Sequence, residues 1–131
     1  MVVYWIFSLD ADELPDEKCI DSLRLLDFDT PAIYKFKRLN HYCDRPIKAC
    51  GWYPDHVIRL FHKSVANFSD EVVHESVKAK NSDDTIILLD GEILHFSFYG
   101  SHQLLQKVLT YTSMYGENYM GKPKSVITIL L

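Results

Sequence analysis

The chain has 131 residues, of which 47% are hydrophobic, and a formal net charge of −4 at pH 7. This length is typical of one domain, and the hydrophobic fraction is sufficient for a packed core. No basic stripe runs along the sequence, which argues against nucleic acid as a main partner. No apolar run approaches the roughly 20 residues that a membrane-spanning helix needs.

Three cysteines, Cys19, Cys43 and Cys50, occur in a chain that shows no signal peptide. Met1 leads directly into an apolar run, without a basic n-region or a small-residue cleavage site. An odd number of cysteines in such a chain predicts reduced thiols in a cytoplasmic protein. Cys43 and Cys50 could instead join a histidine at a zinc site, although their separation fits no paired zinc-knuckle spacing.

The first part of the chain predicts a strand, a helix and a second strand. Val2 to Leu9 is almost continuously apolar, which favours a strand buried on both faces of a parallel or mixed sheet. Pro15 and the acidic residues after it suit the first turn of a helix. Its apolar face would consist of Cys19, Ile20, Leu23 and Leu26. Alternation of aromatic and basic residues predicts a strand over Ala32 to Leu39.

The middle of the chain predicts short strands joined by turns. Asn40 to Pro46 is expected to be a connection, and pairing could resume over Ile47 to Ala49. A tight aromatic loop at 51–55 precedes a short strand over Val57 to Phe61. Further extended pieces are expected at 72–77, 86–89 and 93–98, and Asp90-Gly91 is a strong turn signal before the last of them.

The end of the chain predicts a long helix followed by a new apolar run. Apolar residues at helical spacing favour a helix from about Ser101 to Met120, stopped by Gly121 and Pro123. The residues on its apolar stripe are Leu104, Leu105, Val108, Leu109, Thr112 and Tyr115. Because apolar runs stand at both ends of the sequence, we expect residues 1–131 to be a segment of a larger domain.

Two aspartates stand where a cation could bind. Asp10 and Asp12 directly follow the first predicted strand, with Glu13 beside them. Ligands of open α/β sheets gather beyond the carboxyl ends of strands, and alternate carboxylates there can share a divalent cation. Such a cation can neutralise a diphosphate leaving group. Because Asp-x-Asp is a common pattern, this motif alone favours the alternative of an acidic loop before a helix.

The motif in its context is more specific. Asp10-Ala11-Asp12-Glu13 after an aromatic strand resembles the Asp-x-Asp strand end of glycosyltransferase family 2, which has the GT-A fold. Three later features follow in the order that this family shows: Gly51-Trp52-Tyr53-Pro54-Asp55 with Arg59-Leu60-Phe61, then Val73-His74-Glu75, then Ile93-Leu94-His95. The resemblance covers essentially the whole chain. It points to the branch of lipopolysaccharide inner-core β-glucosyltransferases.

The resemblance implies a fold and a reaction. Residues 1–131 would form one partial GT-A domain, a Rossmann-like α/β fold with a mixed sheet and flanking helices, and would supply the metal-binding and acceptor-side half. The reaction would be inverting transfer of a hexose, expected to be glucose, from a nucleotide-diphosphate sugar to a lipopolysaccharide core saccharide. Mg²⁺ or Mn²⁺ would be the cofactor.

The family has further segments on both sides of this region. Its nucleotide-binding half precedes the first strand, and a basic, hydrophobic tail follows the last helix. We therefore expect the isolated chain to be inactive. Any peripheral contact with the cytoplasmic face of the inner membrane would be made by the tail.

The resemblance also assigns roles to residues. Asp12 and His95 would be metal ligands, and Asp10 would contact the metal or the nucleotide sugar nearby. Glu75 would be the general base that takes the proton of the acceptor hydroxyl, with Asp55 as the rival for that role. Two of these residues also have a purely structural alternative. His95 could be a histidine on a half-buried strand whose hydrogen bonds are made within the protein. Glu75 could be a surface carboxylate paired with a lysine such as Lys78.

Three other residues are candidates for substrate binding. Trp52 and Tyr53 could stack on a sugar ring, because aromatic faces pack against apolar C–H surfaces. They could equally be core aromatics at a turn. Arg59 could bind a phosphate of the nucleotide through its planar guanidinium, and a structural salt bridge is as good an explanation.

Two other classes of function fit the same sequence. The chain could be a non-catalytic remnant of a split or truncated gene. It could also be a small saccharide-binding module that keeps the acceptor-side aromatics and binds sugar without metal or nucleotide.

Overall fold

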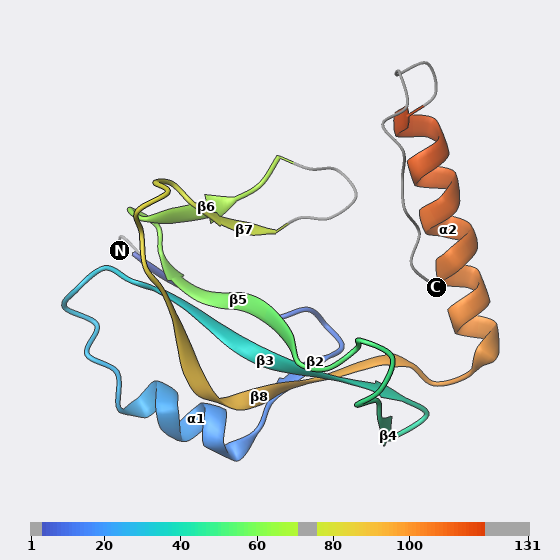
Figure 1. Cartoon of the computed structure of the whole chain (residues 1–131), viewed down its shortest axis with the longest axis horizontal. Helices are drawn as coiled ribbons and strands as arrows, with labels where there is room; N and C mark the ends of the chain where they lie inside the picture. The colour runs from blue at the N-terminus through green and yellow to red at the C-terminus, as the bar shows by residue number, and fades with distance from the viewer. Residues whose placement is uncertain (1–3, 71–75, 120–131) are drawn as a thin grey trace.

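The computed structural model describes residues 4–70 and 76–119 (Figure 1). The described residues form a six-stranded mixed sheet, a two-stranded hairpin and two helices. The sheet order is β1 (Trp5–Phe7), β5 (Asp55–His62), β3 (Ile33–Tyr42), β8 (Ile86–Phe98) and β2 (Glu13–Pro15), and β4 (Arg45–Pro46) pairs with β3. β3 and β8 run parallel, whereas the other pairs are antiparallel. The chain is therefore α/β with a mixed sheet, as predicted.

The first strand differs from the prediction. β1 lies at one edge of the sheet and pairs antiparallel with β5, so it is not a strand buried on both faces. Tyr4 and Phe7 are 53% and 38% exposed. The rings of Trp5 and Phe7 lie beside Tyr34 and Phe36 of β3, and the indole N–H of Trp5 donates to the carbonyl of Phe28. Aromatic residues suit a half-exposed edge as well as a buried strand, which is why the apolar run was misleading.

Helix α1 (Glu17–Arg24) forms where the sequence predicts it. Asp16 is the N-cap, and its side chain accepts from the backbone N–H of Cys19 at 2.8 Å. The same carboxylate accepts from the backbone N–H of Glu92 at 3.0 Å, which ties the helix to β8. Cys19 is fully buried, and this burial raises the pKa of its thiol to about 12.

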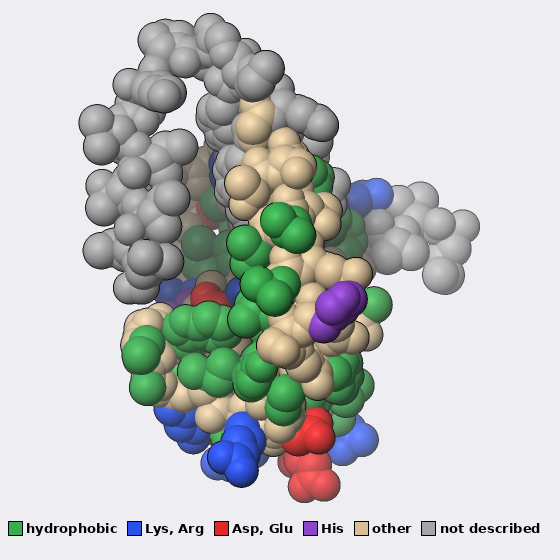
Figure 2. Space-filling model, turned by 90° about the vertical axis from the view of Figure 1, so that its right-hand side faces the viewer, with side chains coloured by type: hydrophobic (Ala, Val, Ile, Leu, Met, Phe, Trp, Pro, Cys, Tyr) green, Lys and Arg blue, Asp and Glu red, His purple; other side chains and the backbone are tan. Residues whose placement is uncertain are grey.

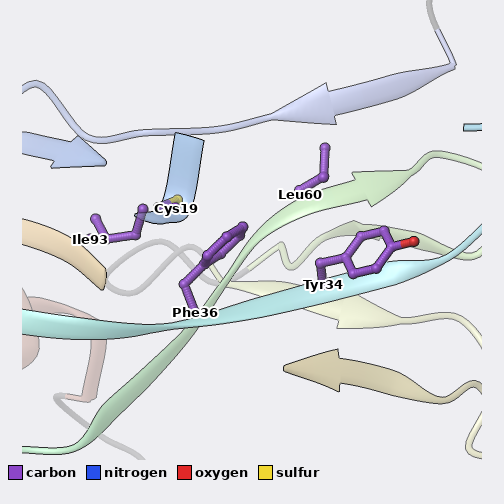
Figure 3. Close-up of a cluster of buried hydrophobic side chains, with 5 residues drawn as sticks. All are labelled: Cys19, Tyr34, Phe36, Leu60 and Ile93. Carbon is purple, nitrogen blue, oxygen red and sulfur yellow. The ribbon is translucent and has the colours of Figure 1, made fainter. Parts of the chain in front are cut away.

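The main core lies between α1 and the central strands. Figure 3 shows its five buried residues, which come from α1, β3, β5 and β8: Cys19, Tyr34, Phe36, Leu60 and Ile93. A second cluster of Ile33, Phe61 and Ala66 is buried on the other side of β3 and β5. The alternation predicted for β3 is thus real, because successive residues of a strand face opposite sides. Each fully buried large side chain contributes about 1.5–3 kcal/mol relative to exposure.

β3 is longer than predicted. It continues to Tyr42 and turns back through Cys43 and Asp44 into β4, so the predicted connection over Asn40 to Pro46 is wrong. Cys43 and Asp44 have φ values of 46° and 61°, as a two-residue hairpin turn requires. A Cys-Asp turn carries no sequence signal of that kind. Pairing with the last residues of β8 supports the added part of the strand.

The predicted turn at Asp90-Gly91 is also wrong. β8 runs without interruption from Ile86 to Phe98, and Gly91 marks an irregularity in its pairing with β3. Gly91 has φ +97°, and a Cβ on it would lie 2.2 Å from the backbone nitrogen of Cys19. The glycine is therefore required for the close approach of α1 to β8, and it does not reverse the chain.

The remaining elements extend from the sheet. Strand β5 confirms the prediction at 57–61, and β6 (Ala66–Phe68) pairs with β7 (Val77–Ala79) in a separate hairpin (Figure 1). Most of the extended piece predicted at 72–77 lies outside the described residues. The apolar run at 126–131 also lies outside them.

Helix α2 (Ser101–Tyr119) confirms the predicted C-terminal helix. It leaves the end of β8 and stands away from the sheet (Figure 1). Much of its apolar stripe is exposed, because Leu105, Val108 and Leu109 are 62%, 52% and 68% accessible. Hydrophobic side chains are visible on the face of the molecule that carries this helix (Figure 2). Neither of the two helices among the described residues combines the length and apolar composition that crossing a membrane would require.

We predict that Gly91→Ala destabilises the protein by about 2 to 5 kcal/mol, because it adds backbone strain to a clash with α1. Urea unfolding followed by circular dichroism measures the change. Gly100→Ala is the matched control, because a Cβ there meets no atom within 4 Å. Equal stability of the two variants would show that α1 does not pack this closely on β8.

Candidate functional site

The candidate site lies where the turn between β1 and β2 meets the carboxyl-terminal half of β8. The turn is closed by a backbone hydrogen bond from Glu13 to Asp10. The carbonyl of Asp12 accepts from the backbone N–H of Phe96 at 2.9 Å, and β2 pairs with β8 so that Glu13 stands opposite His95. These backbone contacts fix the acidic turn beside the histidine.

Asp12 and His95, the two predicted metal ligands, are brought together. Nε2 of His95 lies 3.4 Å from Oδ2 of Asp12, and Nζ of Lys107 lies 3.6 Å from the same oxygen. Burial lowers the pKa of His95, and the opposing attraction of Asp12 does not outweigh it. The ring is therefore neutral near pH 7, which is the form in which imidazole binds metals.

The donor set at this place fits a divalent cation that is shared with a substrate. A carboxylate and a neutral imidazole lie within reach of each other, and their side chains are 32% and 16% exposed. Among the residues that the structure describes, no three His, Cys, Asp or Glu side chains form a group suited to a metal. Mg²⁺ and Mn²⁺ typically take one or two protein ligands and complete their shell with phosphate oxygens and water. The residues therefore fit such a cation and do not resemble a closed structural site.

A network of charged residues around the buried Glu13 supports the acidic turn. The side chain of Glu13 is fully buried, and its Oε1 accepts from Arg59 Nη2 at 2.6 Å and from Arg38 Nη1 at 3.4 Å. Arg59 also binds Asp10 at 2.7 Å, and Arg38 binds Asp55 at 2.6 Å. Two arginines thus connect three carboxylates from β2, β5 and the turn.

This network bears on three of the candidate residues. Arg59 makes the salt bridges that were the alternative to phosphate binding, and its side chain is only 12% exposed. Asp10 is 57% exposed and stands on the outer side of Arg59. Asp55 begins β5, and its Oδ2 is held by both Nε and Nη2 of Arg38.

In the aromatic loop before β5, Tyr53 is held by a hydrogen bond and Trp52 is exposed. Tyr53 donates to Oε1 of Glu92 at 2.5 Å, a hydrogen bond that raises the pKa of the phenol, and Lys48 lies over its ring. The carbonyl of Trp52 accepts from Nδ2 of Asn40, while the residue itself is 40% exposed. Trp52 therefore presents an accessible ring, and its stacking on a sugar stays a prediction.

The general base chosen from the sequence, Glu75, lies outside the described residues. The same holds for Val73 and His74 of the motif that contains it. All three cysteines are free, and Cys43 and Cys50 are exposed. No described group of ligands supports the zinc alternative.

Four residues of this region were missed by the sequence analysis as functional candidates: Glu13, Arg38, Asn40 and Glu92. Each is a polar residue on a strand, where alternation would place it on a solvated face. Their partners are set by sheet register, such as Arg38 opposite Asp55 and Asn40 opposite His95. No local pattern in the sequence carries that information.

We predict that Glu13→Gln lowers the free energy of unfolding by about 3 kcal/mol, because it leaves two poorly solvated guanidinium groups with less negative charge. Thermal or urea unfolding provides the measurement. Asp21→Asn is the control, since the Asp21–Arg24 pair is 69% and 74% exposed, and it should change stability by less than about 0.5 kcal/mol. Similar small effects for both variants would contradict the buried network.

Comparison of the sequence with models of known protein families finds no match. The family resemblance seen in the motifs therefore has no independent support at that level. Its implications for activity, substrates and partners are carried forward as a proposal.

Proposed function

We propose that this chain is the metal-binding and acceptor-side part of a family 2 glycosyltransferase. The reaction would be inverting transfer of a hexose, with glucose as the expected sugar, from a nucleotide-diphosphate donor. The acceptor would be a saccharide of the lipopolysaccharide inner core. A partial GT-A domain is the fold that this proposal entails, and the mixed sheet with α1 against it is compatible with such a domain at the coarse level.

One observation carries the proposal. Asp12 and His95 are far apart in the sequence, and the resemblance assigns metal binding to both. Their side chains approach to 3.4 Å at a partly exposed place. Both side chains are of types that bind divalent cations.

The protein residues have separate tasks in this proposal. Asp12 and His95 hold the cation, and the buried Glu13 keeps Arg59 and Arg38 in place beneath the turn. When bound, the cation supplies charge neutralisation to the leaving diphosphate. Lys107 places a further positive charge next to Asp12, where it would attract the same phosphates.

Asp55 is the weaker of the two candidates for the general base. A base must be free to accept the proton of the acceptor hydroxyl. Oδ2 of Asp55 is already bound by the guanidinium of Arg38 at 2.6 Å, so a hydroxyl would have to compete with an arginine for it. Glu75 therefore remains our choice, and Asp55 is better suited to shaping the acceptor side.

The acceptor would bind beside the aromatic loop. Trp52 is 40% exposed and begins a loop that is fixed to β3 and β8 by hydrogen bonds. An accessible indole on such a loop is a suitable surface for the C–H face of a sugar. The lipopolysaccharide acceptor would place the protein at the cytoplasmic face of the inner membrane.

A saccharide-binding module is the second candidate, and the same exposed Trp52 is the observation that favours it.

We predict that the chain binds Mn²⁺ and that Asp12→Asn and His95→Gln each weaken this binding by more than about tenfold, because each removes a ligand. Electron paramagnetic resonance of free Mn²⁺ measures the affinity, first for the metal alone and then with UDP. If metal and UDP share the site, each should raise the affinity for the other.

Two control variants make the test specific. Lys107→Met should strengthen binding of Mn²⁺ alone, because it removes a competing positive charge 3.6 Å from Asp12. Asp21→Asn removes an exposed carboxylate on α1 and should leave the affinity unchanged. The proposal is wrong if the wild type does not bind Mn²⁺, or if Asp12→Asn binds it equally well. Binding of a heptose-containing core saccharide in the presence of EDTA would then support the saccharide-binding module.

A further inference from the structure

The ring of His95 has a second polar contact on the side away from Asp12. Its Nδ1 lies 2.6 Å from Oδ1 of Asn40, which is 7% exposed. The two residues are register partners in the parallel pairing of β3 with β8. Their side chains therefore project to the same face of the sheet, and the short distance is set by the backbone of two central strands.

The orientation of the Asn40 amide follows from its other neighbour. Its Nδ2 lies 3.4 Å from the backbone carbonyl of Trp52, which can only accept a hydrogen bond. The NH₂ group therefore faces Trp52, and the carbonyl oxygen Oδ1 faces His95. Because that oxygen also only accepts, the hydrogen bond to His95 forms when the ring carries a proton on Nδ1.

This orientation determines what His95 presents to Asp12. A neutral imidazole has one N–H, so a proton on Nδ1 leaves the lone pair on Nε2. Nε2 is the atom that lies 3.4 Å from Oδ2 of Asp12, so in this tautomer the ring has no N–H to donate to that oxygen. A lone pair and a carboxylate oxygen that face each other are stabilised by a cation between them.

We infer that Asn40 is a positioning residue for the proposed cation site: it holds His95 in the tautomer with Nδ1 protonated, so that the lone pair of Nε2 faces Asp12. Metal-binding histidines are generally oriented by an acceptor on their other ring nitrogen. The inference about the tautomer depends only on the hydrogen bonds of His95 and Asn40. Its consequence for the metal rests on the proposed function.

Ser97 is the competing candidate for this role. Its Oγ lies 2.9 Å from Nδ1 and 3.4 Å from Nε2 of His95. A hydroxyl can donate or accept, so this contact alone is compatible with either tautomer. The amide oxygen of Asn40 has no such freedom, and its contact with Nδ1 is the shorter one. Asn40 therefore selects the tautomer, and Ser97 adapts to it.

Nitrogen NMR of the histidine rings tests the inference without any metal. At pH 8 the wild type should show His95 with a protonated Nδ1 and an unprotonated Nε2. Asn40→Leu should remove this preference, while Asn40→Asp, which keeps an acceptor facing the ring, should retain it. Ser97→Ala should also retain it. Assignment uses His95→Gln, which deletes the signals.

Mn²⁺ affinity gives the second readout on the same variants. Asn40→Leu should weaken binding by about 10- to 100-fold, and Asn40→Asp should restore most of the affinity. Asn67→Leu, at an exposed asparagine on β6, is the control and should bind as the wild type does.

The two readouts separate this inference from the proposed function. If the wild type shows the expected tautomer and does not bind Mn²⁺, the proposed function fails and the role of Asn40 in orienting His95 stands. The inference is overturned if the proton of His95 is on Nε2 in the wild type. It is also overturned if Ser97→Ala changes the tautomer and Asn40→Leu does not.

Discussion

The parallel pairing of β3 with β8 is the constraint on which the rest of the structure depends. The middle of this pair buries Phe36 and Ile93 under α1, and its carboxyl-terminal part sets Asn40 beside His95. β5 and β2 then add to the outer sides of these two strands. The core and the candidate site are therefore built on the same pair of strands, so a change in their register would disrupt both.

The second constraint is the balance of charge beneath the acidic turn. A fully buried carboxylate such as Glu13 is unfavourable unless positive groups and hydrogen bonds compensate it. Arg59 and Arg38 provide this compensation and are themselves held by Asp10 and Asp55. The network leaves Asp12 outside these contacts, next to His95 and Lys107. The arginines thus satisfy the structural carboxylates, while Asp12 remains available for a cation.

The sequence predicted those parts of the fold that depend on local chemistry. The start of α1, the alternation in β3 and the start of α2 follow from periodicity and local signals, and the structure confirms them. Of the predicted apolar face of α1, Cys19 is buried whereas Ile20 is exposed. Asp90-Gly91 shows the opposite case. The dipeptide has the composition of a turn, but the glycine is needed for contact with a helix that lies far away in the sequence. The sequence indicates that this position requires a glycine, but it does not indicate which neighbouring element causes the requirement.

Part of the candidate site was likewise predicted from the sequence, and part could be found only in the structure. Asp12 and His95 were identified because their motifs have a recognisable order, and their proximity is a property of the fold. Glu13, Arg38 and Asn40 could not be identified, because their roles follow from strand register alone. For Arg59 the sequence left phosphate binding and a salt bridge equally open, and in the structure its Nη2 binds two carboxylates of the protein.

Paramagnetic broadening by Mn²⁺ tests most directly whether Asp12 and His95 form a cation site. Mn²⁺ added at a low ratio to ¹⁵N-labelled protein broadens the backbone signals of residues near the bound ion. We predict selective loss of the signals of Asp12, His95 and Phe96, whereas those of the acidic pair Asp83 and Asp84 before β8 persist. Uniform broadening, or first loss at Asp83 and Asp84, would contradict it.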